Sequence, residues 1–205
     1  MSLVKLLGYS TVVSSSLLLK FPQLLKIHWA GSGQGVSLYS ILVDALSSGI
    51  FVAYCIVNQY PFSSWGESLF LALEGMLIAI LILWYSNQKS YIGGLLLGYV
   101  VCMCLMVSPY ITIPMHTAIQ SCVTPFVMSG KFTQIKQIYS NGGPGQLSYI
   151  TVTFMNYRSW SRLLTSVMET ADIILVTKYG FVSLANSVIA LQCIYYANTG
   201  KLKTK

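Results

Sequence analysis

The sequence predicts an all-α membrane protein of seven transmembrane helices, built from two parallel three-helix repeats joined by a linker helix (3+1+3). Three observations lead to this fold class. The 205 residues are 55% hydrophobic and 8% charged, whereas a soluble domain carries about 25% charged residues. Apolar windows long enough to cross a bilayer recur along the chain. The second half of the sequence also repeats the first half at a fixed offset.

Seven windows of high hydropathy, separated by glycine, proline and charged residues, are the expected spans. Each approaches the roughly 20 apolar residues that a helix needs to cross a bilayer. The connections between them are too short for a soluble domain, so we expect a single membrane domain over residues 1–205. The windows are about 4–27, 36–58, 64–86, 91–107, 111–138, 147–170 and 177–198.

The distribution of lysines predicts the orientation of the chain. Assigning loops to alternate sides places eight lysines on one side and two, Lys5 and Lys178, on the other. By the positive-inside rule the first side is cytosolic, so the N-terminus is expected in the lumen and the C-terminus in the cytosol. The eight are Lys20, Lys26, Lys89, Lys131, Lys136, Lys201, Lys203 and Lys205.

Several classes of protein do not fit the sequence. The formal charge of +7 is scattered between apolar stretches, with no basic stripe for nucleic acid. The five cysteines form no C-x-x-C pair and have no histidine cluster beside them, so we expect no metal site and no disulfide. There is no nucleophile elbow, P-loop or dinucleotide fingerprint, so we expect neither an enzyme nor a cofactor.

The internal repeat has an offset of 111 residues, at which residues 20–23 align with residues 131–134 without a gap. The alignment also brings Ile27 onto Ile138 and Gly31 onto Gly142, and continues downstream to Tyr85 and Tyr196. Repeat one is therefore about 4–86 and repeat two about 111–198. Both lysine-bearing loops lie on the same predicted side, so the copies run in the same direction, which requires the helix at about 91–107 between them.

Lys20-Phe21-Pro22-Gln23, with Gly35-Val36-Ser37 downstream, resembles the signature of the PQ-loop superfamily, which includes the SWEET sugar transporters and cystinosin. Three further stretches resemble the mannose-P-dolichol utilization defect family of the endoplasmic reticulum, and this similarity spans nearly the whole chain. The stretches are residues 61–67, 145–148 and 165–170. Two departures stand out: Thr133 replaces the proline of a strict PQ motif, which suggests unequal hinges, and Arg158 stands where smaller or apolar residues are usual.

The resemblance implies a multi-pass endoplasmic reticulum membrane protein that is required for dolichol-phosphate mannose and dolichol-phosphate glucose to serve as lumenal sugar donors. N-linked glycosylation, GPI anchor biosynthesis and O- and C-mannosylation would depend on it. One mechanism is lipid transport, in which a flippase moves the lipid-linked sugar across the bilayer. Two alternatives stay open: a non-transporting chaperone that presents the donor lipid to lumenal glycosyltransferases, and a SWEET-like carrier of a small soluble solute.

The PQ motif itself supplies a candidate hinge. Pro22 lacks a backbone donor and disrupts a helix near the end of the first expected span, and Gln23 is placed to bond the freed carbonyls. Thr133 and Gln134 are their equivalents in repeat two. The alternative is that Pro22 only marks a helix terminus.

Charged residues within the expected spans are costly and therefore face a cavity or a partner. Arg158, Arg162 and Glu169 share one helical face at spacings of four and seven. A guanidinium fork makes two parallel hydrogen bonds to a phosphate. We therefore expect Arg162, helped by Arg158, to bind the lipid phosphate.

The expected sugar pocket contains Glu74 and Asp44 from repeat one and Asn186 from the last span, in the region that lines the pocket of SWEETs. The alternatives are a structural ion pair, for example Glu74 or Glu67 with an arginine, and a polar helix-packing role for Asn186.

Two further segments are candidates. The expected lumenal loops carry an aromatic belt that is also a candidate contact for a sugar or a glycosyltransferase. The belt is Trp65 with Phe62 and Tyr60, and the loop residues are Pro61, Phe62, Trp65 and Glu67, with Glu169 in the second repeat. The C-terminus carries Lys201 and Lys203 in a K-x-K-x-x pattern, which resembles a retrieval signal for the endoplasmic reticulum.

Overall fold

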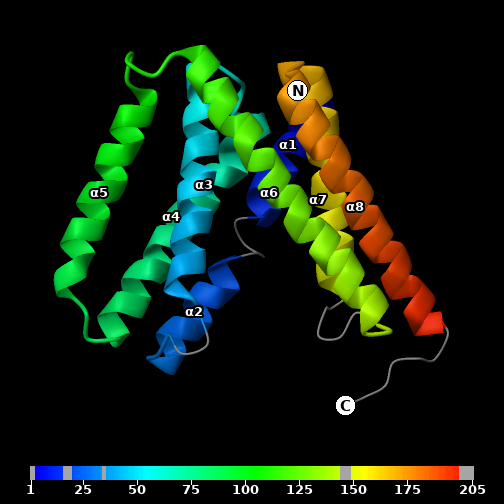
Figure 1. Ribbon diagram of the computed structural model, residues 1–205, viewed down its shortest axis with the longest axis horizontal. Coiled ribbons are helices and arrows are strands. Elements are labelled where there is room, and N and C mark those ends of the chain that lie inside the picture. The colour runs from blue at the N-terminus through cyan, green and yellow to red at the C-terminus, as the bar shows by residue number, and fades with distance from the viewer. Residues whose placement is uncertain (1–2, 16–19, 34–35, 144–148, 199–205) are drawn as a thin grey trace. The chain divides into compact units, whose positions relative to one another are not determined.

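The computed structural model describes residues 3–15, 20–33, 36–143 and 149–198, and within these ranges it is helical with no strand (Figure 1). The α-helices are α1 (Leu3–Ser15), α2 (Phe21–Ala30), α3 (Leu38–Val57), α4 (Phe62–Tyr85), α5 (Ser90–Val107), α6 (Ile113–Ser140), α7 (Tyr149–Thr165) and α8 (Ile173–Asn198), and a π-helical segment, Ser166–Thr170, follows α7.

Every hydropathy window falls on a helix, although the first is divided between α1 and α2. Four of the described helices are long and apolar enough to cross a membrane, and they are Leu38–Val57, Phe62–Tyr85, Ser90–Val107 and Ile173–Tyr196. The membrane character of the chain is therefore confirmed for these helices. Crossing of the bilayer by α1 with α2, by α6 and by α7 stays a prediction.

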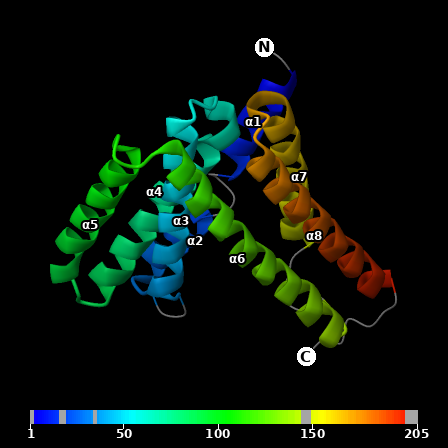
Figure 2. The same cartoon turned by 45° about the horizontal axis from the view of Figure 1, so that its top comes forward.

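The chain packs as two compact units, residues 1–120 and residues 121–205, which we describe separately. In the first unit α3 and α4 pack against each other, α1 and α2 pack on α4, and α5 lies beside α3 (Figures 1 and 2). In the second unit α7 and α8 pack along each other. The linker helix of the sequence analysis is α5, within the first unit.

The internal repeat extends to the helix boundaries. At the offset of 111 residues the first residue of α3, Leu38, corresponds to the first residue of α7, and Phe62 of α4 corresponds to Ile173 of α8. Gly31 ends α2 with φ 58° and Gly142 follows α6 with φ 65°. Glycine adopts this left-handed conformation without a steric penalty and commonly terminates helices.

The two hydrophobic cores also correspond residue by residue. The core of the first unit contains Ile27, Ile41, Ile78, Ala79 and Ile82. The residues at the same offset in the second unit pack together as well, and they are Ile138, Val152, Ile189, Ala190 and Cys193. Both cores join the end of the first helix of the repeat to the start of the second and the end of the third. The repeat is therefore a repeat of packing as well as of sequence.

The first helix differs between the two copies. In repeat one α1 ends at Ser15 and α2 begins at Phe21, with Pro22 in its first turn, where a proline needs no backbone donor. In repeat two α6 continues through Thr133 and contains Pro125, a proline that the sequence analysis did not single out. The predicted inequality of the two PQ positions therefore exists in the backbone, and movement at either position stays a prediction.

Candidate functional site

A polar seam runs through the first unit where α1 and the start of α2 meet α4. We use this name for a set of buried polar side chains: Thr11, Ser15, Lys20, Ser63, Ser64, Glu67 and Ser68. The two helices approach closely at Gly8, where an added Cβ would lie 2.8 Å from the Cβ of Ser63. Polar groups away from water need partners, so this seam is a candidate site for a polar ligand.

Glu67 lies at the centre of the seam and is only 1% exposed. One of its carboxylate oxygens, Oε2, accepts a hydrogen bond from the hydroxyl of Ser15 at 3.0 Å. An intramembrane carboxylate is costly, and such residues commonly mark substrate or ion pathways. Glu67 therefore belongs to the interior of the first unit.

The expected lumenal loop is wrong for most of its residues. Pro61 is the residue that precedes α4, and Phe62, Trp65 and Glu67 lie in the first two turns of that helix. Proline suits a helix start because its missing N–H would have no partner there, so the helix begins earlier than the hydropathy window. Trp65 donates from Nε1 to the carbonyl of Tyr60 at 2.9 Å, which fixes the indole at this end.

Lys20 is buried beside α4, although the lysine count had assigned it to the cytosolic surface. Its Nζ lies 2.5 Å from Oδ2 of Asp44 and donates to the carbonyl of Leu71 at 3.2 Å. Leu71 is the tenth of the 24 residues of α4, about 14 Å from the start of the helix at 1.5 Å per residue. The ammonium therefore lies well inside the bundle, where the Asp44 carboxylate is its counterion. Seven lysines then oppose two in the orientation count.

Gly75 leaves the space that the ammonium occupies. A Cβ at this position would lie 3.0 Å from Nζ of Lys20 and 3.0 Å from Cβ of Ala45. The neighbouring Glu74 is half-buried and lies within range of the charge of Lys20. Its Oε2 is buried and has no hydrogen-bond partner among the residues that the structure describes. Lys20, Asp44 and Glu74 thus form a charged site in repeat one, and the alternative that pairs Glu74 or Glu67 with an arginine stays untested.

In the second unit Arg162 is fully buried, at 1% exposed, and Arg158 is half-buried one turn earlier on α7. Glu169 lies in the π-helical segment that begins at Ser166, so it is neither in a loop nor on a continuous α-helix with the arginines. A π-helix has a different repeat from an α-helix, so the expected shared face at a spacing of seven does not extend past Thr165.

Asn186 of α8 is 5% exposed and donates from Nδ2 to the carbonyl of Met155 in α7 at 3.2 Å. The next residue, Ser187, accepts hydrogen bonds from Nδ2 of Asn156 at 3.3 Å and from Nε1 of Trp160 at 3.1 Å. These bonds join the two helices, as the helix-packing alternative for Asn186 predicted. A role of Asn186 in binding a sugar stays a prediction.

The predicted pocket residues are divided between the units. Asp44 and Glu74 lie in the first unit, whereas Arg158, Arg162 and Asn186 lie in the second. The structure brings Asp44 and Glu74 to Lys20 and places the two arginines on one helix. A single pocket that combines both sets stays a prediction.

Some predicted features fall outside the described ranges or stay untested. The retrieval lysines, Lys201 and Lys203, and the stretch at residues 145–148 lie outside the residues that the structure describes. In the described part of the chain, no three His, Cys, Asp or Glu side chains are grouped for a metal ion. The hinge residues Gln23 and Gln134 are half-buried on α2 and α6.

Sequence reasoning missed three features of the interior. It counted Lys20 as a loop charge, although an aspartate inside the next span signals that a buried cation is needed nearby. It gave Gly75 no role of its own. It also gave no role to His116, a side chain that is 1% exposed and has no hydrogen-bond partner at either ring nitrogen in the described ranges. No signal in the sequence distinguished that histidine.

Comparison with known proteins relates the chain to a repeat family and to a human solute carrier. Residues 3–64 match the model of the PQ loop repeat family. Human solute carrier family 66 member 3 is 23% identical to this chain over 185 residues, which cover 88% of each protein. No solved structure matches the chain. The PQ-loop resemblance is thus confirmed for the first repeat, where the polar seam lies, and the resemblance to the mannose-P-dolichol utilization defect family stays a prediction.

Proposed function

We propose that the protein is a transporter of the PQ-loop type in the endoplasmic reticulum membrane, which moves the head group of dolichol-phosphate mannose or dolichol-phosphate glucose between the leaflets. The polyprenyl tail stays in the lipid while the phosphate and the sugar pass through the helix bundle. The lipids then serve as lumenal sugar donors for N-linked glycosylation and GPI anchor biosynthesis.

The burial of Arg162 is the observation that carries this proposal. Its guanidinium is charged at any physiological pH, and its planar fork matches two oxygens of a phosphodiester. An arginine inside a membrane helix commonly marks the pathway of a substrate or ion. Arg158, one turn away and half-buried, supplies a second cation for the same head group.

The charged site of repeat one supports a polar cargo. Glu74 and Asp44 offer carboxylate oxygens that accept hydrogen bonds from sugar hydroxyls, and Lys20 supplies donors. In the proposed cycle these groups bind the hydroxyls of the sugar.

A vesicle assay tests this function directly. The full-length protein is reconstituted in phosphatidylcholine vesicles that contain a fluorescent, short-chain analogue of dolichol-phosphate mannose, and the transbilayer rate is measured against protein-free vesicles. Arg162→Lys keeps the charge but loses the fork. We expect its rate to fall by about tenfold, since a charge-assisted hydrogen bond contributes about 1.5–3 kcal/mol.

Lys136→Ala is the matched control, because Lys136 is an exposed cation of the same unit. Size-exclusion chromatography of each variant establishes that the fold is intact. An unchanged transbilayer rate with the wild-type protein, at a protein-to-lipid ratio where a known scramblase is active, would overturn the proposal. No transfer by the isolated protein, together with a copurified glycosyltransferase, would identify the non-transporting chaperone instead.

A cellular experiment separates donor use from ordinary solute transport. Cells that lack the protein are expected to accumulate lipid-linked oligosaccharides without their lumenal mannose and glucose residues. Arg162→Ala should reproduce this profile, and Lys136→Ala should restore the normal one. Full rescue by Arg162→Ala would remove this residue from the mechanism.

A second candidate function is the transport of a small soluble solute. Similarity to a human protein named as a solute carrier favours it, as does the ion pair of Lys20 and Asp44 inside the first unit, which offers both charges to a polar solute. Uptake into vesicles of a water-soluble sugar or amino acid that lacks a prenyl chain would favour this candidate over the first.

A further inference from the structure

A groove runs along the first unit between α5 and the pair of α3 and α4. Three neighbouring cavities form it, with volumes of about 540, 390 and 190 Å³. The first two share residues of α3 and α5, and the third joins the second at Tyr99. We call it the α5 groove and define it by Leu42, Leu46, Gly94, Leu95, Gly98 and Tyr99.

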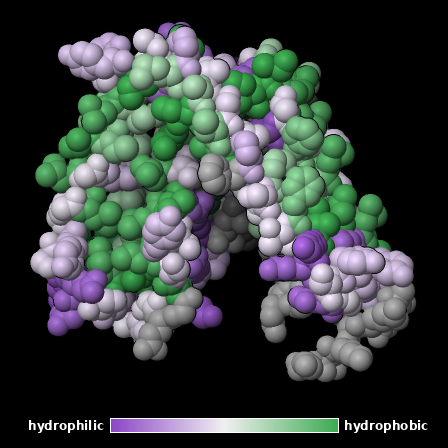
Figure 3. Space-filling model, in the orientation of Figure 1, coloured by the Kyte–Doolittle hydropathy of each residue, from purple (hydrophilic) through white to green (hydrophobic). Residues whose placement is uncertain are grey.

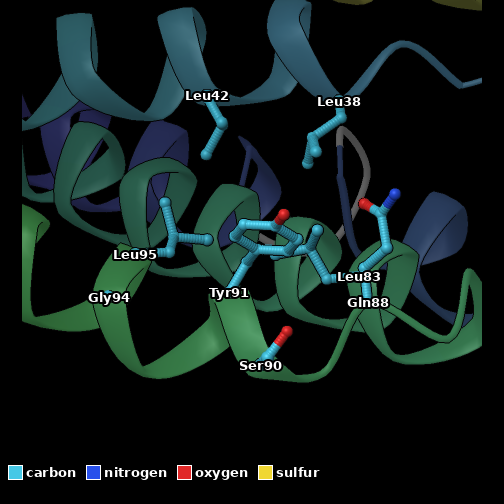
Figure 4. Close-up of a pocket in the computed structure, with 8 residues that line it drawn as sticks. All are labelled: Leu38, Leu42, Leu83, Gln88, Ser90, Tyr91, Gly94 and Leu95. Carbon is cyan, nitrogen blue, oxygen red and sulfur yellow. The ribbon is translucent and has the colours of Figure 1, made fainter.

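The walls of the α5 groove are apolar along most of its length, and its polar groups gather at one end. Figure 4 shows the ring of Tyr91 between Leu95 and Leu83, with Gln88 and Ser90 near the turn from α4 to α5. In Figure 3 the surface over the middle of α5 is apolar, and polar residues lie where α4 turns into α5. This distribution matches a hydrocarbon chain that ends in a polar head group.

Two glycines of α5 keep the groove open. A Cβ added at Gly94 or at Gly98 would meet nothing within 4 Å. The spacing of four residues places both on one face of the helix, and both line the groove. Glycine disfavours a helix by about 1 kcal/mol relative to alanine, so the open space on this face has an energetic cost that an occupant can offset.

The polar end of the groove carries positive charge. Lys89 precedes the first residue of α5, and its Nζ lies 4.0 Å from the centre of the Trp84 ring. The N-terminus of a helix is the positive end of its dipole. A lysine beside an aromatic ring is typical of the interface between membrane and water, where anionic lipid head groups lie.

We propose that the α5 groove binds one acyl chain of an anionic glycerophospholipid, with the phosphate at Lys89 and the first turn of α5. The distance along α5 from Ser90 to Cys102 is about 18 Å, close to the roughly 15 Å that each leaflet contributes to the hydrocarbon core. This length suits a lipid confined to one leaflet better than a long polyprenyl chain. The inference is independent of the proposed transport, because the groove shares no residue with the charged site of repeat one.

The binding of lipid is tested by photo-crosslinking. The full-length protein is placed in phosphatidylcholine vesicles that contain a small fraction of phosphatidylserine with a diazirine on one acyl chain, and labelled peptides are mapped by mass spectrometry. We expect labels on α3 and α5 along the groove. The double variant Gly94→Leu with Gly98→Leu adds side chains to the groove from positions where a Cβ meets nothing within 4 Å. We expect labelling there to fall by about tenfold, a factor that corresponds to about 1.4 kcal/mol.

Gly93→Leu is the matched control, because Gly93 also has nothing within 4 Å of an added Cβ but does not line the groove. We expect it to label like the wild-type protein. Circular dichroism and size-exclusion chromatography establish that the three leucine substitutions leave the fold unchanged. Equal labelling of the groove in the double variant and the control would overturn the proposal.

The head group is tested separately. Lys89→Gln should label equally with diazirine-bearing phosphatidylserine and phosphatidylcholine, whereas the wild-type protein and Lys26→Gln, a control at an exposed lysine, should prefer phosphatidylserine. A preference that persists in Lys89→Gln would contradict the assignment of the phosphate. Labelling of the groove by a diazirine-bearing polyprenyl phosphate but not by phosphatidylserine would overturn the choice of lipid, and would leave the proposed transport untouched.

Discussion

The two repeats join their helices at the same position with different chemistry. In repeat one the ammonium of Lys20 lies over Gly75 and pairs with Asp44. At the offset of 111 residues Asn186 replaces Gly75 and Met155 replaces Asp44, and the amide of Asn186 donates to the Met155 carbonyl. One copy is therefore held by a charged pair and the other by a neutral hydrogen bond.

The difference teaches which part of a repeat tolerates change. The apolar cores correspond at all five buried positions of repeat one, because small or medium apolar side chains pack in the same space. Polar groups must instead be matched to partners: both copies carry the lysine, as Lys20 and Lys131, but the carboxylate of Asp44 is replaced by Met155 in repeat two. The chain thus uses one fold twice and gives the ion pair described here to only one of the copies.

The largest change in stability is expected when the residues at the PQ position are exchanged between the repeats. Thr133→Pro places a proline inside continuous α6, where it removes an N–H and clashes with the carbonyl of Ser129, which already accepts the Thr133 hydroxyl at 2.8 Å. We expect a loss of about 3 kcal/mol in the free energy of unfolding. Pro22→Thr, in the first turn of α2, should cost only a few tenths. Denaturant titration in mild detergent measures both, and equal losses would contradict the difference between the two helices.

The second largest change in stability is expected when the buried cation of repeat one is removed. Lys20→Met leaves Asp44 without its counterion, and removal of one partner of a buried ion pair costs about 3–5 kcal/mol. The Asp44 side chain is 58% exposed, so we expect a smaller loss of about 2 kcal/mol. Lys26→Met, at an exposed lysine of α2, is the control and should change little. A variant Lys20→Met as stable as this control would show that the pair does not hold repeat one together.

A third variant imports the residue of repeat two into repeat one. Gly75→Asn brings a Cβ to within 3.0 Å of Ala45 and of the Lys20 ammonium, and overpacking of this kind costs about 1–3 kcal/mol. In combination with Lys20→Met, which removes the ammonium, the substitution Gly75→Asn supplies an amide that can donate to the backbone of α3. We expect the double variant to be more stable than the sum of the single losses by about 1 kcal/mol. Strictly additive losses would mean that the neutral hydrogen bond of repeat two cannot replace the ion pair of repeat one.

The smallest effect removes the neutral bond of repeat two. Asn186→Leu should lower the free energy of unfolding by about 1 kcal/mol, within the range measured for hydrogen bonds between membrane helices. Asn141→Leu, at an exposed position after α6, serves as the control. A larger loss of stability in Asn186→Leu than in Lys20→Met would contradict the expectation that the ion pair stabilises its repeat more than the neutral hydrogen bond does.

Much of the fold could be predicted from the sequence because hydropathy and the repeat are local signals. The windows located each helix, and the offset from residues 20–23 extended to the cores. The start of α4 was missed because a window average does not detect Pro61 as a helix start. The π-helical segment after Thr165 was missed because nothing in the residue pattern distinguishes it from an α-helix.

Less of the candidate site could be predicted. The positive-inside count treats every lysine at the edge of a span as a surface charge. The long apolar stem of a lysine also allows it to turn inward toward a carboxylate, as Lys20 does toward Asp44. The helix-packing bond of Asn186 was one of two open interpretations, since an amide inside a span finds a partner either way. The α5 groove depends on the separation of three helices, which no single segment of sequence encodes.

The matching cores lie near the same end of each helical triplet, next to the turns at Gly31 and Gly142. These apolar contacts resist separation of the helices, so each triplet is held together at this end. In the proposed transport, this packed end would keep each copy folded while the head group passes.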